Sequence, residues 1–107
     1  MGERTRLIEE IIKSKGYSIA LFTTFNFEIE FFERAILSRL YDNGIRKVSL
    51  FVDADEFEKS LKSIDANRAN ISLGKKYIVS PVSIHGAFHP KMVLLLGKRK
   101  SKLIVAS

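Results

Sequence analysis

The chain has 107 residues, of which 46% are hydrophobic, enough for one folded domain and too many for a disordered chain. It contains no cysteine, which excludes disulfides and thiolate metal sites and fits a reducing cytoplasm. No apolar run approaches the roughly 20 residues that a membrane-spanning helix needs, so we expect no membrane partner.

Charge is distributed unevenly along the chain. Residues 1–65 carry all 12 acidic residues and 10 basic ones, a net charge of −2, whereas residues 66–107 carry eight basic residues and no acidic one. A segment with a charge of +8 indicates an anionic partner, nucleic acid or a membrane surface, although a lysine-rich soluble surface has the same composition.

The first part of the chain predicts a helix, a strand and a second helix. Residues 4–14 have the periodicity of an amphipathic helix, and residues 17–25 are rich in the β-branched and aromatic residues of a buried strand. Asn26 is a candidate N-cap for a helix over residues 28–41. The apolar face of the first helix is expected to consist of Leu7, Ile8, Ile11 and Ile12. That of the second is expected to consist of Ile29, Phe32, Ile36, Leu37 and Leu40.

The rest of the chain predicts one more helix between strands and a closing hairpin. We expect a strand over residues 46–52, a helix over 53–64 and a third strand over 75–84. A fourth strand begins near His89, and a fifth covers residues 102–106. The third helix is expected to bury Phe57, Leu61 and Ile64.

This order of elements predicts an α/β fold. Helices that alternate with strands imply right-handed parallel crossovers, and the last two strands are close enough to form a hairpin. We therefore expect a mixed, mostly parallel sheet with helices on both faces, in a single domain over residues 1–107. The chain stops inside an apolar strand, from which we expect an N-terminal fragment of a longer protein.

His89 and Lys91 stand out because they open the apolar run Met92–Leu96. In an extended strand, residues i and i+2 point to the same face, so the imidazole and the ammonium would project together. A strand that is apolar at every position is usually covered on both faces, and burying two polar groups beside it is costly without a partner. A phosphate is a suitable partner; the alternative is a strand start from which Lys91 reaches solvent.

The run FHPKMVLLL, a turn and KLIVAS resemble the catalytic half-motif of the phospholipase D superfamily. That motif is His-x-Lys, four residues, Asp, and a later Gly/Thr/Ala-Ser-x-Asn. His89 and Lys91 match the first two positions, Leu96 stands at the Asp position, and Ala106-Ser107 resembles the start of the closing motif. The tyrosyl-DNA phosphodiesterase branch also lacks that Asp, and FTTFNFEIEFF is similar to its early strand and helix. The resemblance implies a phospholipase D-like half-domain.

In this superfamily a histidine attacks phosphorus and forms a covalent phosphohistidine, without a metal or other cofactor. The resemblance implies that His89 is the nucleophile or the acid/base and that Lys91 binds the phosphate oxygens. Ser107 and Asn26 are further candidates for phosphate contact. The family's site needs a second half-motif, which would come from a missing C-terminal part or from the second copy in a homodimer.

The resemblance and the basic segment together predict a metal-independent phosphodiesterase that acts on nucleic acid, as a nuclease or DNA-processing domain. The run Lys98, Arg99 and Lys100 would then grip a nucleic-acid backbone; its simpler interpretation is a solvated hairpin tip. One alternative is a catalytically inactive half-domain for DNA binding or dimerisation, consistent with Leu96. Another is a lipid phosphodiesterase, for which the sequence offers no membrane-binding segment.

Two other polar groups have simple interpretations. His85 is interpreted as a loop histidine, because two histidines lack the companions that a zinc site needs. The acidic residues between positions 53 and 58 are interpreted as the first turn of a helix rather than as a metal cluster. They are Asp53, Asp55, Glu56 and Glu58.

Overall fold

The computed structural model describes residues 3–24, 27–64, 72–83 and 91–106. Within them, helices and strands follow the expected order, with ends shifted by a few residues. The helices are α1 (Glu3–Lys13), the consecutive segments α2 (Ile29–Phe31), η1 (Phe32–Leu37, π-helical) and α3 (Ser38–Asp42), and α4 (Ala54–Lys62). The strands are β1 (Ile19–Thr24), β2 (Lys47–Asp53), β3 (Ile78–Val82), β4 (Lys91–Leu96) and β5 (Ser101–Ala106). None of these helices is long and apolar enough to cross a membrane.

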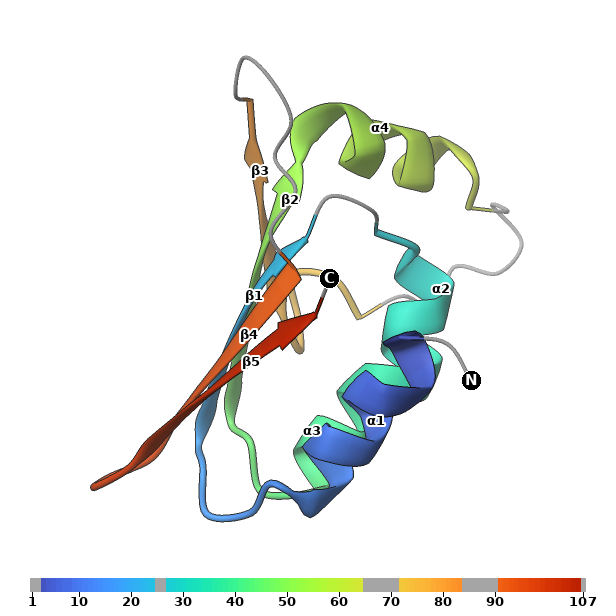
Figure 1. Ribbon diagram of the computed structural model, residues 1–107. Coiled ribbons are helices and arrows are strands. Elements are labelled where there is room, and N and C mark those ends of the chain that lie inside the picture. Colours follow the sequence, from blue (N-terminus) through green and yellow to red (C-terminus); the bar gives the residue numbers. More distant parts are fainter. Residues whose placement is uncertain (1–2, 25–26, 65–71, 84–90, 107) are drawn as a thin grey trace.

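The strands form one mixed sheet in the order β3-β2-β1-β4-β5 (Figure 1). β1 pairs in parallel with β2, and β2 with β3, whereas β4 is antiparallel to both β1 and β5. These directions bring the carboxyl ends of β1, β2, β3 and β5 together with the start of β4. We call this the carboxyl end of the sheet. The opposite end carries the turn between β4 and β5, residues 97–100, and we call it the turn end.

All described helices cover the same face of the sheet (Figure 1). The predicted α/β class and mixed sheet are confirmed, but the described helices do not include the expected cover on the second face. The strand order explains the difference. The crossovers from β1 to β2 and from β2 to β3 move in the same direction across the sheet, and right-handed crossovers then place both helices on one face.

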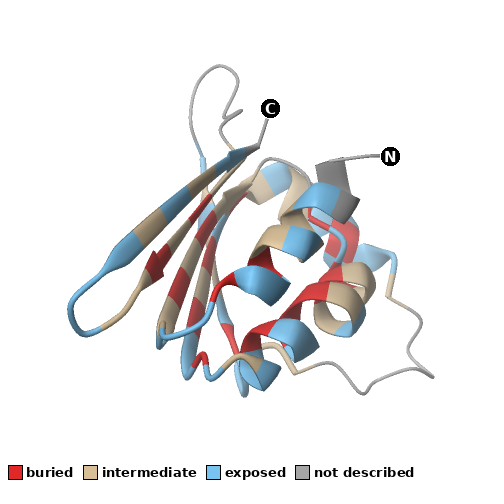
Figure 2. Cartoon of the chain, turned by 60° about the horizontal axis from the view of Figure 1, so that its bottom comes forward, coloured by how far each residue is buried: buried red, intermediate tan, exposed pale blue. Residues whose placement is uncertain are grey.

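The core lies between this covered face and the helices, where Figure 2 shows the buried residues facing each other. The predicted core face of the second helix is confirmed, since all five of its members are buried. In α1, Ile11 is buried but Ile12 is exposed, because adjacent helical residues diverge by about 100° and Ile12 is turned away from the core. In α4, Leu61 is likewise exposed, and Ser60 takes the buried position, where its hydroxyl accepts a hydrogen bond from the Ile29 amide at 3.2 Å.

The second face of the sheet is apolar as well. The register places Met92, Leu94 and Leu96 on it, all half-buried, whereas Val93 and Leu95 of the same strand are buried against the helices. The large apolar side chains exposed to solvent on this second face are Phe51, Ile78, Leu103 and Val105. The described helices thus leave an apolar sheet face uncovered.

Candidate active site

The carboxyl end of the sheet carries Lys91, the second residue of the predicted pair. Lys91 is the first residue of β4 and is paired in register with Ala106, the last residue of β5. On the other side of β4, Thr23 is paired with Met92, and β1 ends one residue later at Thr24. Three strand termini therefore meet around Lys91.

The other residues predicted at this site, His89, Asn26 and Ser107, lie outside the described residues. Each is joined by the chain to one of these three termini. His89 comes two residues before Lys91, Asn26 two residues after the end of β1, and Ser107 one residue after the end of β5. The topology thus places the strand ends next to these candidates in the chain at one end of the sheet. Their roles stay predictions.

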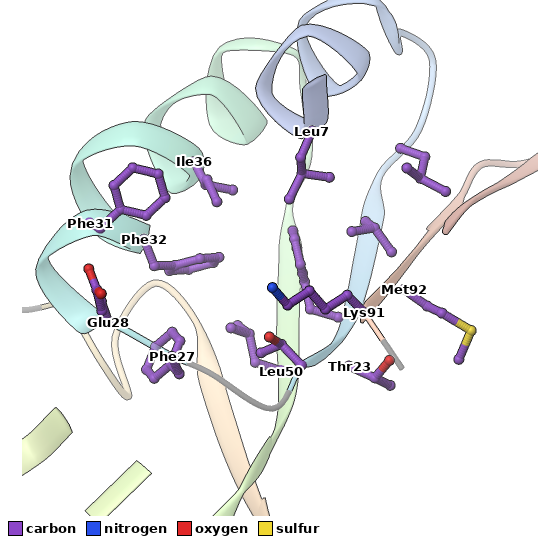
Figure 3. Close-up of a pocket in the computed structure, with 14 residues that line it drawn as sticks. Leu7, Thr23, Phe27, Glu28, Phe31, Phe32, Ile36, Leu50, Lys91 and Met92 are labelled. Carbon is purple, nitrogen blue, oxygen red and sulfur yellow. The ribbon is translucent and has the colours of Figure 1, made fainter. Parts of the chain in front are cut away.

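Lys91 points to the helix-covered face and lines a pocket of about 140 Å³ (Figure 3). Its side chain is half-buried and reaches into the middle of the pocket. An ammonium with low-dielectric neighbours attracts an anion more strongly than one in open water. The other lining residues are Leu7, Phe22, Thr23, Thr24, Phe27, Glu28, Phe31, Phe32, Ile36, Leu50, Met92, Val93 and Ile104.

Phenylalanine rings form much of the pocket wall. The centroids of Phe27 and Phe32 are 5.7 Å apart, and Phe22 meets Phe32 edge to face at 5.5 Å. These three rings are buried, and the half-buried Phe31 adds a fourth. Of these four phenylalanines, the sequence pattern predicts only Phe32, as a core residue. The signal that could have indicated the pocket is the spacing of Phe27 and Phe31, four residues apart immediately after a strand.

The acidic residues of α4 serve the helix. The Asp53 carboxylate accepts a hydrogen bond from the Glu56 amide at 3.1 Å and so caps the start of α4, as the sequence interpretation expects. Asp55 and Glu56 lie in the first turn. Within the described residues, no group of three or more histidine, cysteine or acidic side chains could hold a metal ion.

The structure does not bring Lys98, Arg99 and Lys100 together with Lys91. They form the turn at the opposite end of β4, which is six residues long, or roughly 17 Å from first to last residue. Lys100 instead donates a hydrogen bond to the Lys15 carbonyl at 2.7 Å and lies 4.5 Å from the centroid of the Tyr17 ring. This run therefore lies about one strand length from Lys91, and its contact with a nucleic-acid backbone stays a prediction.

Leu96, which stands at the superfamily's Asp position, also lies at the turn end. It is paired in register with Ile19 of β1 and Ser101 of β5. A carboxylate at position 96 would be separated from Lys91 by the same roughly 17 Å of strand and could not orient side chains at the carboxyl end. The presence of leucine instead of aspartate at position 96 therefore does not deprive the candidate site of a side chain.

Comparison with known proteins gives a likeness in fold alone. No protein-family model and no curated protein matches the sequence. A crystal structure of a mutant yeast tyrosyl-DNA phosphodiesterase resembles this chain with a TM-score of 0.57 over 90% of the chain, at 14% sequence identity. The chain spans 21% of the length of that protein. The α/β fold of this chain is therefore similar to the fold of part of that protein.

Proposed function

We propose that this chain is a phospholipase D-like phosphodiesterase domain that acts on nucleic acid. The observation that carries the proposal is Lys91, whose side chain reaches into a pocket walled mainly by phenylalanines at the carboxyl end of the sheet, two residues after His89. Ligands of open α/β sheets bind outside the carboxyl ends of the strands. The similarity in fold to a tyrosyl-DNA phosphodiesterase and the charge of residues 66–107 both favour a nucleic acid as the substrate.

The proposed reaction has two steps and uses no metal. An imidazole nitrogen of His89 bonds to phosphorus while the bond from phosphorus to the leaving oxygen breaks, and an acid of a second half-site gives that oxygen a proton. Water then attacks the phosphohistidine, loses its proton to the same group, and releases a phosphate monoester with free His89. Lys91 binds the non-bridging oxygens in both steps. The second half-site comes from the rest of a longer protein or from a second copy of this chain.

Hydrolysis of a chromogenic phosphodiester in EDTA tests the proposal, using the longest form of the protein that can be made. We expect turnover that resists EDTA and falls roughly 1,000-fold or more in His89→Ala. His85→Ala is the matched control and should keep the wild-type rate, since His85 has no role in the mechanism. Equal rates in wild type and His89→Ala, with folding intact, would contradict the proposal.

A second candidate is a catalytically inactive half-domain for DNA binding or dimerisation. The uncovered apolar sheet face, with Phe51, Ile78, Leu103 and Val105 exposed, favours an assembly role. This candidate predicts salt-dependent DNA binding without any turnover in the complete protein. EDTA-resistant turnover there would rule it out.

A further inference from the structure

The four chain segments at the turn end of the sheet concentrate the positive charge of the molecule. They are residues 13–18 before β1, 42–47 at the start of β2, 74–77 before β3, and 97–100 between β4 and β5. Of the 18 basic and 12 acidic residues of the chain, these segments hold nine basic residues and one acidic residue, a net charge of +8. The other nine basic and 11 acidic residues give −2, so the chain's charge of +6 comes from this end.

Contacts between these segments join them into one surface. The Arg46 amide donates to the Ser18 carbonyl at 2.7 Å, and the Ser18 amide donates to the Leu96 carbonyl at 2.8 Å, immediately before the turn between β4 and β5. The Tyr41 hydroxyl donates to the Lys76 carbonyl, which connects the segment before β3 to α3. Figure 1 shows the connections that lead into β1 and β2 side by side at the bottom of the view.

The basic side chains of this surface are all exposed. Among the described residues, the lysines that pair with glutamates are Lys59, Lys62 and Lys102, and none of these belongs to the four segments. Lys100 donates a hydrogen bond to the Lys15 carbonyl, which carries no charge to neutralise it. The basic residues of the surface are Lys13, Lys15, Arg46, Lys47, Lys75, Lys76, Lys98, Arg99 and Lys100.

The fold accounts for few of these charges. Lys13 lies in the last turn of α1, where the helix dipole favours a cation, but the other basic residues of the surface lie outside the helices. Like charges within about 10 Å repel each other, so gathering them at one end costs folding free energy. A surface that needs only solubility mixes both signs, whereas Asp42 is the one acidic residue in the four segments. This arrangement indicates an anionic partner.

The strand order arranges the basic residues in a row. In the order β3-β2-β1-β4-β5, the segments follow one another as 74–77, 42–47, 13–18 and 97–100. Five strands spaced roughly 4.8 Å apart span about 19 Å. Along one strand of a DNA duplex a phosphate recurs about every 3.4 Å, so a row of this length faces roughly five or six phosphates.

The chemistry of the surface fits a nucleic-acid backbone better than a membrane. Basic protein surfaces that bind membranes also insert apolar side chains. In the four segments, every exposed residue is charged, serine or glycine. Since no aromatic side chain is exposed in these segments to stack on bases, the contacts are with phosphates and do not depend on the base sequence.

We propose that the turn end is a second nucleic-acid-binding surface, which holds the phosphate backbone independently of sequence and apart from the candidate active site. It lies about one strand length, roughly 17 Å, from Lys91, so a nucleic acid bound at Lys91 reaches it only when it extends about five nucleotides further. The surface therefore favours long nucleic acids over short ones. The inference rests on the proposed function, because that function identifies the polyanion as a nucleic acid.

Binding of a fluorescein-labelled DNA duplex to the full chain, measured by anisotropy over a range of salt concentrations, tests the inference. A turn-end variant neutralises one basic residue in each of three segments, and a helix variant neutralises three exposed basic residues of η1 and α4 as the matched control. The turn-end variant is Lys47→Gln with Lys76→Gln and Lys98→Gln, and the helix variant is Arg34→Gln with Lys59→Gln and Lys62→Gln.

The turn-end variant should bind the duplex roughly 30-fold or more weakly than the wild type at about 0.1 M salt, with a salt dependence that is shallower by about three phosphate contacts. The helix variant should bind within about threefold of the wild type, because its charges act only from a distance. Equal affinities of the two variants would overturn the inference, and so would a wild-type chain that binds no duplex. Vesicles of phosphatidylserine and phosphatidylcholine that displace the duplex would assign the surface to a membrane and overturn it too.

The two proposals fail separately. Duplex binding that is lost in the turn-end variant alone, with no EDTA-resistant turnover in the complete protein, would overturn the phosphodiesterase proposal and leave a nucleic-acid-binding domain. Turnover of the chromogenic phosphodiester that depends on His89, with equal duplex affinities of the two variants, would overturn the turn-end surface alone.

Discussion

The lysines at the two ends of β4 have different contacts. At the carboxyl end, the Lys91 side chain reaches into a pocket lined by phenylalanines. At the turn end, Lys100 donates to the Lys15 carbonyl, and Lys102 donates to the Glu10 carboxylate at 3.0 Å and to the Ser14 hydroxyl at 2.9 Å. The turn-end cations fasten the hairpin to the end of α1. Lys100 and Lys102, two of the eight basic residues in positions 66–107, thus make contacts within the chain.

Other contacts at the turn end serve the same structural purpose. The Asn43 side-chain amide donates to the carbonyls of Ile11 and Ile12 at 2.6 and 3.1 Å, in the last turn of α1, where the Ile11 carbonyl also accepts from the Ser14 amide at 3.1 Å. Gly97 approaches the Gly16 carbonyl oxygen so closely that a Cβ on it would lie only 2.6 Å away. At the turn end, close contacts thus join the end of α1 to the residues after α3 and to the β4–β5 hairpin. The carboxyl end instead has an open pocket.

The largest effect that separates the two ends is expected from Lys91→Ala in the complete protein. Loss of a positive group that binds the phosphate oxygens should lower kcat/KM for a phosphodiester roughly 100-fold or more. Lys98→Ala removes the same charge from the exposed turn and should change kcat/KM less than about threefold, by weaker long-range attraction. Equal losses in the two variants would mean that the two ends do not differ in function.

A smaller effect, on stability, is expected at the turn end from Tyr77→Phe. Tyr77 is buried just before β3 and donates to the Glu33 carboxylate at 2.7 Å, and burial together with this hydrogen bond raises the pKa of its phenol. The same carboxylate accepts from the Ser72 amide at 2.8 Å. Loss of the phenol donor should lower the free energy of unfolding by about 1–2 kcal/mol, measured by urea denaturation.

Tyr41→Phe is the matched control for that measurement. The Tyr41 hydroxyl donates to the Lys76 carbonyl, but the side chain is exposed, so water can replace the lost bond. Its effect should be no more than a few tenths of a kcal/mol. If Tyr41→Phe lowers the free energy of unfolding as much as Tyr77→Phe does, burial does not determine the energetic cost of losing these hydrogen bonds.

The smallest effect is expected from the ion pair between Glu10 and Lys102. The Lys102 hydrogen bond and its charge lower the pKa of Glu10 from its ordinary value of 4.5. The stabilisation is therefore complete above pH 4.5 and is lost as the pH falls through the lowered pKa. Glu10→Gln should melt slightly below wild type at pH 7, and the difference in Tm should vanish in strong acid. A difference in Tm that grows on acidification would contradict this assignment.

Much of the fold follows from local patterns in the sequence. The core face of the second helix is confirmed, and that helix, expected over residues 28–41, ends at Asp42, because periodicity acts over a few residues. The exposure of Ile12 and Leu61 depends instead on which side of each helix meets the sheet. The single covered face depends on strand order, which the local pattern does not contain.

The candidate site divides in the same way. The sequence indicates Lys91 directly, through its place before an apolar strand. The sequence does not show that the Asn43 side chain donates to a carbonyl at the end of α1, because the two residues are far apart in the chain. Nor does it show that Phe27, Phe31 and Phe32 line a pocket, because the walls of this pocket come from distant elements. The separation of Lys98 from Lys91 could have been predicted, since a hairpin with six-residue strands places its turn far from its open end.

The most direct test of the central claim is to find the phosphorus atom on His89 during turnover. The complete protein would be mixed with a phosphodiester in EDTA, quenched in alkali to preserve phosphohistidine, and mapped by peptide mass spectrometry. We predict an adduct on the peptide that contains His89, and none in His89→Ala. EDTA-resistant turnover with no adduct on His89, or with the adduct on another residue, would contradict the account.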